Sequence, residues 1–335
     1  RLRVVLTFQS LLVGGNPFST TSVYCLIAFL ERRWGVHFPM GGTGAIVTGL
    51  VKLIEGQGGS VRCNHGVAQI MVEGTGRQAR ASGVRLDSGE TIGADVVVSN
   101  ADSAWTYRHL VAPEHRTRWT DRRIERARYS MSLFVWYFGT KRTYPDVAHH
   151  TIALGPRYRE LLTDIFDRKV LADDFSLYLH RPTATDPSLA PPGCDAFYVL
   201  SPVPHLQSGT DWAVQAEPYR LAIQQRLQET LLPGLADAIV TSRLLTPQDF
   251  QDRLSSFRGA AFSLEPVLTQ SAWFRPHNRS EELQGLYLVG AGTHPGAGLP
   301  GVLSSARVLD SVVPHADTLD APSRARPDSL RPAAA

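Results

Sequence analysis

Apolar positions near the N-terminus repeat every three or four residues, the spacing of one face of an α-helix. Residues 8–33 run from a Gly-Gly-Asn-Pro turn through Ser and Thr residues into an apolar stretch that ends in charged residues. These start and stop signals predict a capped helix. Residues 46–54 have the same apolar spacing and follow a glycine-rich turn at residues 41–44, so we expect a helix with one buried face. The turn lacks the Lys-Ser/Thr pair of a P-loop and is interpreted as a plain helix start.

β-Branched residues and turn signals mark the next region as β-structure. Predicted strands cover residues 60–72, 81–86 and 91–99, with a turn at Asp87-Ser88-Gly89. The unbroken run Val96-Val97-Val98 is typical of a strand buried on both faces, as in a parallel sheet covered by helices.

Aromatic strands and frequent prolines set residues 113–253 apart from the rest of the chain. Strands are expected at residues 133–138 and 175–179, and a helix at residues 218–231. We interpret this region as a second domain inserted into the first. The tail, residues 314–335, has no apolar period and is predicted to be disordered.

Composition excludes several classes of protein. With 43% hydrophobic and 19% charged residues among 335, the sequence is that of an ordinary globular protein. Its 34 basic and 31 acidic residues are too balanced for a nucleic-acid-binding protein, which concentrates basic charge on one face. No apolar run approaches the roughly 20 residues of a spanning helix, so contact with a membrane would come from its surface. The chain starts at Arg1 without an initiator methionine or a targeting signal, which we interpret as a truncated start.

The cysteines and histidines follow no metal-binding pattern. Cys25, Cys63 and Cys194 are far apart and odd in number, which fits a reducing cytoplasm better than a disulfide framework. His149 and His150 are adjacent and would point to opposite faces of a strand. The sequence contains neither an H-E-x-x-H motif nor a G-x-S-x-G turn, so we expect no metal site and no hydrolase chemistry.

Residues 285–309 carry the clearest chemical signal: a short apolar strand, a loop with five glycines, and a helix. The loop contains a literal G-x-G-x-x-G, but no second strand with an acidic residue follows, so this segment must close a sheet and not open one. Glycines let the backbone approach a ligand closely, and the first turn of the helix presents free N–H groups to negative charge. A cofactor with a pyrophosphate, or a flavin ring, would suit this site. Tight packing of the strand on the helix is the simpler alternative.

The run from Leu286 to Val302 resembles the C-terminal signature of bacterial-type phytoene desaturases, and further segments resemble the same family in order. These segments are FQSLLVGGNPFSTTSVY (8–24), FPMGGTGAIVTGLVKL (38–53), VVVSNAD (96–102), SLFVWYFG (132–139), HHTIALGPRYRELLTDIF (149–166), DFSLYLH (174–180), FYVLSPVPHL (197–206) and FSLEPVLTQSAWFRPHNR (262–279). The resemblance covers nearly everything from Phe8 to Val313.

The resemblance implies an α/β fold. It implies a two-domain flavoprotein, in which an α+β substrate domain interrupts the Rossmann-like FAD domain. The implied segments are residues 1–40 (substrate domain), 41–113 (FAD domain), 114–255 (substrate domain, facing a membrane), 256–313 (C-terminal part of the FAD domain) and 314–335 (disordered tail). The family's main dinucleotide fingerprint lies near the N-terminus, and this sequence does not contain it. The FAD domain is therefore expected to be incomplete, and activity of this chain alone is an open question.

The same resemblance assigns site residues by position. The residues implied to approach FAD in the C-terminal loop are Gly292, Thr293, Gly296, Gly298, Leu299, Pro300, Gly301 and Val302. It also implies that Val67 lies near the adenine and Ala101 near the edge of the cofactor. No catalytic base is identified. His294 is a candidate because a free histidine titrates near neutral pH, and the alternative is that it only forms hydrogen bonds within the loop.

The implied reaction is the dehydrogenation of phytoene toward neurosporene or lycopene, with partly desaturated carotenes on the way and a quinone or oxygen as electron acceptor. A substrate without polar groups must be recognised by apolar burial, at about 25 cal/mol per Å², so we expect a lipophilic tunnel that opens toward a bilayer. Candidate lining residues are Phe8, Leu11, Leu12, Phe18, Tyr24, Trp136, Tyr137, Phe138 and Tyr178. Their alternative role is core packing.

An arginine-dense stretch at residues 115–128 is either a basic helix on anionic lipid or a solvated face. With the resemblance, it leads us to expect a cytoplasmic protein at the membrane surface. Two alternatives stay open for the function. One is a sister carotenoid dehydrogenase, isomerase or ketolase, and the other is a non-catalytic fragment that binds an apolar ligand and a membrane.

Overall fold

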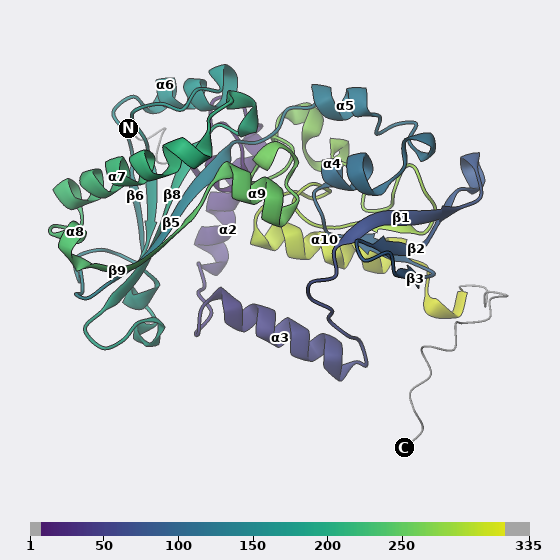
Figure 1. Cartoon of the computed structure of the whole chain (residues 1–335), viewed down its shortest axis with the longest axis horizontal. Helices are drawn as coiled ribbons and strands as arrows, with labels where there is room; N and C mark the ends of the chain where they lie inside the picture. The colour runs from purple at the N-terminus through teal and green to yellow at the C-terminus, as the bar shows by residue number, and fades with distance from the viewer. Residues whose placement is uncertain (1–7, 319–335) are drawn as a thin grey trace.

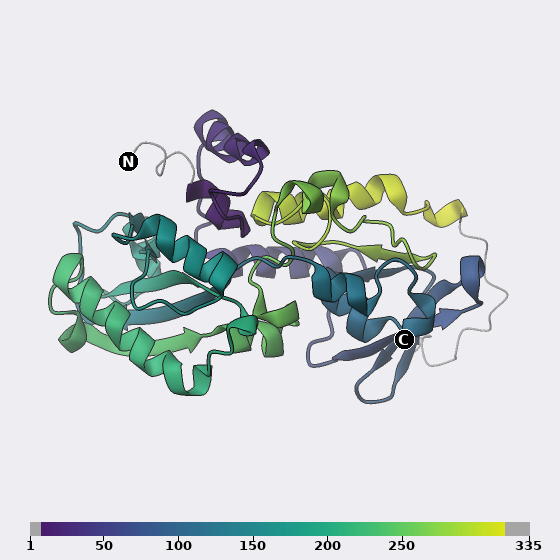
Figure 2. The same cartoon turned by 90° about the horizontal axis from the view of Figure 1, so that it is seen from above.

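The computed structural model describes residues 8–318, which form two bodies side by side along the long axis of the molecule (Figures 1 and 2). We call them the five-stranded body, built on residues 132–245, and the glycine-loop body, built on residues 67–131 and 257–312. An N-terminal segment, residues 8–34, lies at the junction between them (Figure 2). The predicted tail at residues 314–335 lies mostly outside the described residues.

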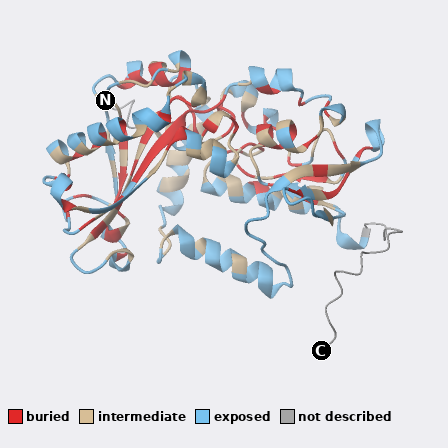
Figure 3. Ribbon diagram, in the orientation of Figure 1, coloured by how far each residue is buried: buried red, intermediate tan, exposed pale blue. Residues whose placement is uncertain are grey.

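The five-stranded body is an antiparallel sheet with strand order β6-β7-β8-β5-β9. Its strands are β5 (Ser132–Thr140), β6 (His150–Ala153), β7 (Leu177–His180), β8 (Asp195–Val203) and β9 (Ile239–Leu245). Side chains alternate between the two faces of β5. Phe134, Trp136 and Phe138 pack toward α7 (Trp212–Thr230), and Leu133 and Val135 pack toward α6 (Tyr158–Thr163). Both faces of β5 therefore contribute to a core, and its ribbon is mostly red in Figure 3, although Tyr137 stays 43% exposed.

The predicted helix at residues 218–231 is confirmed but begins earlier, at Trp212. Asp211 caps it, because its side chain accepts a hydrogen bond from the backbone N–H of Ala213. Pro218 lies inside the first two turns, and the sequence reading mistook it for the start of the helix.

The glycine-loop body contains two small sheets. An antiparallel sheet comprises β1 (Val67–Glu73), β2 (Arg80–Leu86) and β3 (Thr91–Gly93), and a parallel pair comprises β4 (Val97–Ser99) and β10 (Leu286–Leu288). Its helices include α4 (Ser103–Trp105), α5 (Asp121–Arg126) and α10 (Leu299–Val312). The parallel pairing predicted for the valine run is confirmed. The prediction that this strand is buried on both faces is wrong. Val97 is buried, but Val98 is 45% exposed, because no described residue covers that face of the strand.

The N-terminal helices form as predicted, but their packing differs from the expectation. They are α2 (Leu26–Trp34) and α3 (Thr43–Gly56). The prediction that α3 buries one face is wrong. No residue of α3 is buried, and the side chains of Val47 and Leu53 are more than half exposed. Figures 1 and 3 show why, since α3 lies apart from both bodies. No helix within residues 8–318 is long and apolar enough to cross a membrane.

The remaining elements within the described residues are short helical turns and two further helices, α8 and α9. They are η1 (Phe8–Val13), η2 (Ser22–Cys25), η3 (Gly76–Gln78), η4 (Thr106–Leu110), η5 (Pro113–His115), η6 (Asp164–Arg168), η7 (Pro182–Ala184), η8 (Pro187–Leu189), η9 (Leu206–Ser208), α8 (Leu235–Ala238), α9 (Pro247–Leu254), η10 (Phe257–Gly259), η11 (Leu268–Gln270), η12 (Ala272–Phe274) and η13 (Ala316–Thr318).

His205 lies just after β8 and is 3% exposed. Its Nδ1 accepts a hydrogen bond from the backbone N–H of Gln207 at 3.4 Å. Burial, together with the positive charges of Lys169 and Arg258, lowers the pKa of His205 to about 3. His205 is therefore neutral in the folded chain at neutral pH, and an unfolded chain binds the proton more readily below about pH 6.5.

We predict that this histidine makes the protein less stable in acid. Below pH 6.5 the unfolded state binds more protons than the native state, so stability falls with pH until the native pKa is reached. His205→Asn keeps a hydrogen-bond acceptor but does not titrate. Between pH 7 and pH 5 the variant should lose about 2 kcal/mol less unfolding free energy than the parent chain, measured by denaturant titration. The exposed His65→Asn is the control and should keep the pH dependence of the parent. Equal pH dependence in the parent and His205→Asn would contradict the prediction.

Candidate functional site

The loop between β10 and α10 is held in shape by Asn278. Its Nδ2 donates to the carbonyl oxygens of Leu288 at 3.2 Å, His294 at 3.0 Å and Ser305 at 3.3 Å. These carbonyls come from the strand, the loop and the helix, so one buried amide ties the three parts together. Ser305 adds a second tie, because its Oγ accepts from the backbone N–H of Gly290 at 2.8 Å. The sequence analysis did not single out Asn278 or Ser305, although Asn278 lies within one of the quoted segments.

Three glycines of the loop are required by close packing. A Cβ on Gly290 would lie 2.6 Å from Oδ1 of Asn100, and one on Gly292 would lie 2.5 Å from Oγ of Ser103. A Cβ on Gly301 would lie 2.7 Å from the carbonyl oxygen of Gly296. Close packing therefore accounts for these three positions, but the loop packs against the segment after β4 and against itself rather than strand against helix.

Gly296 and Gly298 are glycines for a different reason. Their φ angles are 136° and 91°, in the region that side chains disfavour. They lead into α10, whose cap residue Gly298 provides no side-chain hydrogen bond to the helix. The first turn of α10 therefore keeps free N–H groups, which favour negative charge. Pro300 fits this turn because it has no N–H to satisfy.

Arg275 supplies a buried positive charge beside the loop. It is 2% exposed, and its guanidinium donates to the carbonyl oxygens of Ala291, Leu264 and Gln270. Burial lowers the pKa of Arg275, but a guanidinium stays charged in proteins. Its Nε has no partner among the described residues and lies 3.6 Å from the position of a Cβ on Gly296. The sequence analysis missed this residue because an isolated arginine gives no signal in a single sequence.

The loop fits an anionic or electron-accepting cofactor. Arg275 Nε and His294 Nδ1 are buried polar atoms without a hydrogen-bond partner in the described part of the chain. Arg275 Nε lies beside Gly296, close before α10, and His294 belongs to the same loop, so hydrogen-bonding capacity is left unused along the loop. A flavin or its pyrophosphate is the kind of group that this set of donors would hold.

The structure brings most of the predicted site residues together. Thr293 is buried in the loop, Leu299 and Pro300 are exposed at the start of α10, and Val302 follows in the same turn. Ala101 joins them, because it lies between β4 and α4, where Ser103 Oγ donates to the carbonyl oxygen of Gly292 at 3.1 Å. Val67 lies elsewhere, at the first position of β1, paired with Leu86. Contact of these residues with FAD, and a catalytic role for His294, stay predictions.

The candidate tunnel residues divide between core and surface. Trp136 and Phe138 belong to the core beneath α7, which favours their alternative role in packing. Tyr137 lies on the opposite face of β5, 5.6 Å from Tyr198 between ring centroids, and Tyr178 lies 5.9 Å beyond Tyr198. These three tyrosines form an aromatic row across the sheet. The other candidates, Phe8, Leu11, Leu12, Phe18 and Tyr24, lie in the N-terminal segment at the junction of the bodies.

Adjacent histidines lie near the end of this row. The prediction that His149 and His150 point to opposite faces is wrong, since their ring centroids are 4.4 Å apart. Strand β6 begins at His150, so His149 lies before the strand. The alternation of side chains between the two faces of a strand therefore does not apply to His149.

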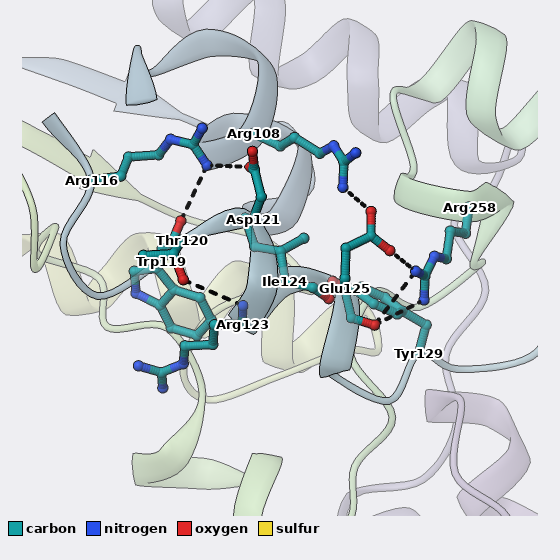
Figure 4. A network of polar contacts seen from close by, with 10 residues as sticks. All are labelled: Arg108, Arg116, Trp119, Thr120, Asp121, Arg123, Ile124, Glu125, Tyr129 and Arg258. Carbon is teal, nitrogen blue, oxygen red and sulfur yellow. Dashed lines mark hydrogen bonds and ion pairs between the residues drawn. The ribbon is translucent and has the colours of Figure 1, made fainter. Parts of the chain in front are cut away.

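Only residues 121–126 of the arginine-dense stretch are helical; they form α5, whose acidic side chains pair with arginines outside the helix (Figure 4). Arg116 pairs with Asp121 at 2.6 Å and lowers the pKa of that carboxyl. Arg108 and Arg258 both pair with Glu125, whose pKa they lower in the same way. Arg108, Arg116 and Arg258, which lie outside α5, are therefore neutralised within the protein, whereas Arg122 and Arg126 of α5 are exposed.

We predict that Asn278→Ala destabilises the site. The substitution removes a buried donor from three carbonyl oxygens and should lower the unfolding free energy by about 3 kcal/mol in denaturant titration. Arg279→Ala, which truncates an exposed side chain in the same segment, is the control and should change it by less than about 0.5 kcal/mol. A loss for Asn278→Ala no larger than for the control would mean that Asn278 does not hold the loop.

Comparison with known proteins places this geometry in a family. A family model for flavin containing amine oxidoreductases matches residues 2–308. The chain is 50% identical, over 97% of its length, to a phytoene desaturase (neurosporene-forming) from Rhodobacter capsulatus, and it covers 62% of that relative. It is 53% identical, over 93% of its length, to a phytoene desaturase (lycopene-forming) from Pseudescherichia vulneris, of which it covers 63%.

A solved structure agrees on the fold. An oxidoreductase from Methanosarcina mazei matches with a TM-score of 0.63 and 19% identity, over 92% of this chain and 64% of that protein. At this identity the likeness shows the fold alone. The predicted α/β flavoprotein fold is confirmed, and the flavin of the matching family supports FAD as the cofactor. The chain spans less than two thirds of the curated relatives that it matches, and it belongs to the family of flavin containing amine oxidoreductases.

Proposed function

We propose that this chain is part of a phytoene desaturase, an FAD-dependent oxidoreductase that dehydrogenates phytoene toward neurosporene or lycopene. The observation that carries the proposal is the identity of 50% and 53%, over more than nine tenths of the chain, with two relatives of that name. Because the chain covers 62% and 63% of those relatives, the activity is assigned to a longer protein that contains it.

The residues of the loop would hold and tune the cofactor. When bound, FAD supplies the electron sink that removal of hydrogen from an unactivated C–H bond requires and that no side chain provides. Arg275 and the first turn of α10 direct positive potential toward the loop and so favour negative charge there. Asn278 and Ser305 fix the loop between strand and helix, which keeps these donors in place without rearrangement.

Recognition of the substrate would rest on apolar contact. The row of Tyr137, Tyr198 and Tyr178 offers aromatic rings on the sheet face opposite α7, where Tyr137 is 43% exposed. A polyene without polar groups can be held on such a surface by burial at about 25 cal/mol per Å².

We further propose that the protein works in the cytoplasm at a membrane surface, where phytoene is dissolved, and that a quinone or oxygen accepts the electrons. Large apolar side chains on and around α2 and α3 support this placement, because Phe29, Trp34 and Met40 are each more than half exposed. Arg122 and Arg126 on α5 are exposed as well and offer a separate, basic contact, since α5 and α3 lie at opposite edges of the molecule (Figure 1). Basic residues near an anionic membrane each contribute about 1 kcal/mol to binding.

The activity is tested with two proteins, the chain as given and a version extended at its N-terminus with the matching segment of the Rhodobacter capsulatus relative. Each is incubated with FAD and with phytoene in liposomes, and the products are separated by chromatography. We expect coloured polyenes from the extended protein and none from the chain alone, since the latter lacks the family's main dinucleotide fingerprint. An extended protein that binds flavin tightly but leaves phytoene unchanged would contradict the proposal and favour a sister reaction on another carotenoid.

Membrane binding is tested with a double variant, Arg122→Ala with Arg126→Ala. Removing two exposed charges should weaken binding to anionic liposomes about 30-fold, at about 1 kcal/mol per arginine. The matched control removes Arg226 and Arg253, two exposed arginines on α7 and α9, and should bind as the parent does. If sedimentation with anionic liposomes is the same for the parent and for Arg122→Ala with Arg126→Ala, α5 is not the membrane contact.

A further inference from the structure

Three histidines meet at the edge of the five-stranded sheet, away from the glycine-rich loop. His150 in β6 and His180 in β7 are directly paired across the two strands, and His149 precedes β6. One ring nitrogen from each of the three lies within 4.8 Å of the others. The Nε2 atoms of His149 and His180 are 2.8 Å apart. His149 and His180 are separated by 31 positions in the sequence, so no short spacing motif could reveal the cluster.

Neighbouring side chains already orient two of the rings. His149 Nδ1 lies 2.5 Å from Oγ1 of Thr185, and His150 Nδ1 lies 2.6 Å from the hydroxyl of Tyr178. Hydrogen bonds from one ring nitrogen to an outer group are the usual way in which proteins fix a histidine that binds metal through its other nitrogen. The Nε2 of His149 is thereby left facing the cluster.

The third ring is buried and incompletely satisfied. His180 is 7% exposed, and its Nδ1 has no hydrogen-bond partner within the described residues. Burial lowers the pKa of all three histidines, that of His180 to about 4. Neutral imidazole is the form that binds metal ions, so the cluster needs no deprotonation at neutral pH.

We propose that His149, His150 and His180 form a binding site for a divalent transition-metal ion of the zinc class, with its fourth position open to water. Three uncharged nitrogen ligands suit zinc, copper, nickel or cobalt, whereas calcium and magnesium require oxygen ligands. At Zn–N distances of about 2.0–2.1 Å, tetrahedral geometry places ligand nitrogens about 3.3 Å apart. The His149–His180 pair must open slightly, and the exposed ring of His150 must swing inward. The proposal departs from the sequence-based expectation of no metal site.

A metal ion here would fasten three parts of the chain. It would join β6 to β7 at the sheet edge, and it would immobilise the ring of His149, which packs 4.8 Å from Phe38 between ring centroids. Phe38 belongs to the connection between α2 and α3. Further along that connection, the backbone N–H of Gly41 donates to Oδ2 of Asp186 at 2.7 Å, and Asp186 is the residue that caps η8. The site is therefore placed to control how firmly the N-terminal helices attach to the sheet.

The test uses the 335-residue chain purified without a polyhistidine tag and stripped with EDTA. Zn²⁺ is titrated by calorimetry, and Co²⁺ by visible absorption. We expect one Zn²⁺ per chain, a higher midpoint of thermal unfolding with Zn²⁺ present, and a Co²⁺ spectrum without a thiolate charge-transfer band. His150→Ala and His149→Ala should each weaken Zn²⁺ binding at least about tenfold. Both variants spare the buried His180, and circular dichroism checks their fold.

The matched control is His65→Ala. His65 is exposed and lies two residues from Cys63, whose thiol is free, so it represents the other place where zinc could bind. This variant should bind Zn²⁺ as tightly as the parent. The proposal is overturned if the parent binds no Zn²⁺ at millimolar concentration, which would make the cluster a hydrogen-bonded trio. It is equally overturned if the Co²⁺ spectrum carries a thiolate band, or if folded His149→Ala and His150→Ala bind like the parent.

Discussion

The parallel pairing of β4 with β10 is the constraint on which the glycine-rich loop depends. Two strands far apart in the sequence align Val97 with Leu286 and Ser99 with Leu288. The pairing continues into the loops beyond, where the N–H of Val289 donates to the carbonyl of Ser99 at 3.0 Å. Loss of this register would separate Ser103 from Gly292, which lie 189 positions apart in the chain. The loop has its shape because the ends of the two strands point the same way.

Buried polar groups, more than apolar contacts, define the chemistry of this loop. Asn278 satisfies carbonyl oxygens from three elements, and Arg275 satisfies three more from the surrounding turns. Each would be costly to bury alone, and each is stable here because nearly all of its partners are supplied by the backbone. Among the described residues, Arg275 Nε is left without a partner beside the loop, and so is Nδ1 of His294 within it. A loop that binds a ligand needs hydrogen-bonding capacity of this kind, whereas a loop that only packs does not.

Alternation of side chains gives the two faces of the five-stranded sheet different surroundings. One face carries Phe134, Trp136 and Phe138 into a core with α7. The other face carries the row of Tyr137, Tyr198 and Tyr178, which leads to the histidine cluster, where the ring of His180 lies 4.4 Å from that of Tyr198. Aromatic residues at neighbouring positions of one strand therefore have different roles. The sequence reading placed Trp136 and Tyr137 together because it could not tell which face of the sheet would be covered.

Local patterns in the sequence determined the helices, most strands and the glycine-rich loop, because capping residues, apolar periods and glycines act over a few positions. The family resemblance supplied the flavoprotein fold and the order of its segments. Tertiary structure alone decided what depends on distant partners. It left the apolar face of α3 and the side chain of Val98 exposed, although both read as buried. It also made Asn278 and Arg275 the centre of the loop, and it gathered His149, His150 and His180. Periodicity specifies which side of an element is apolar, whereas burial and site assembly depend on which other element lies against that side.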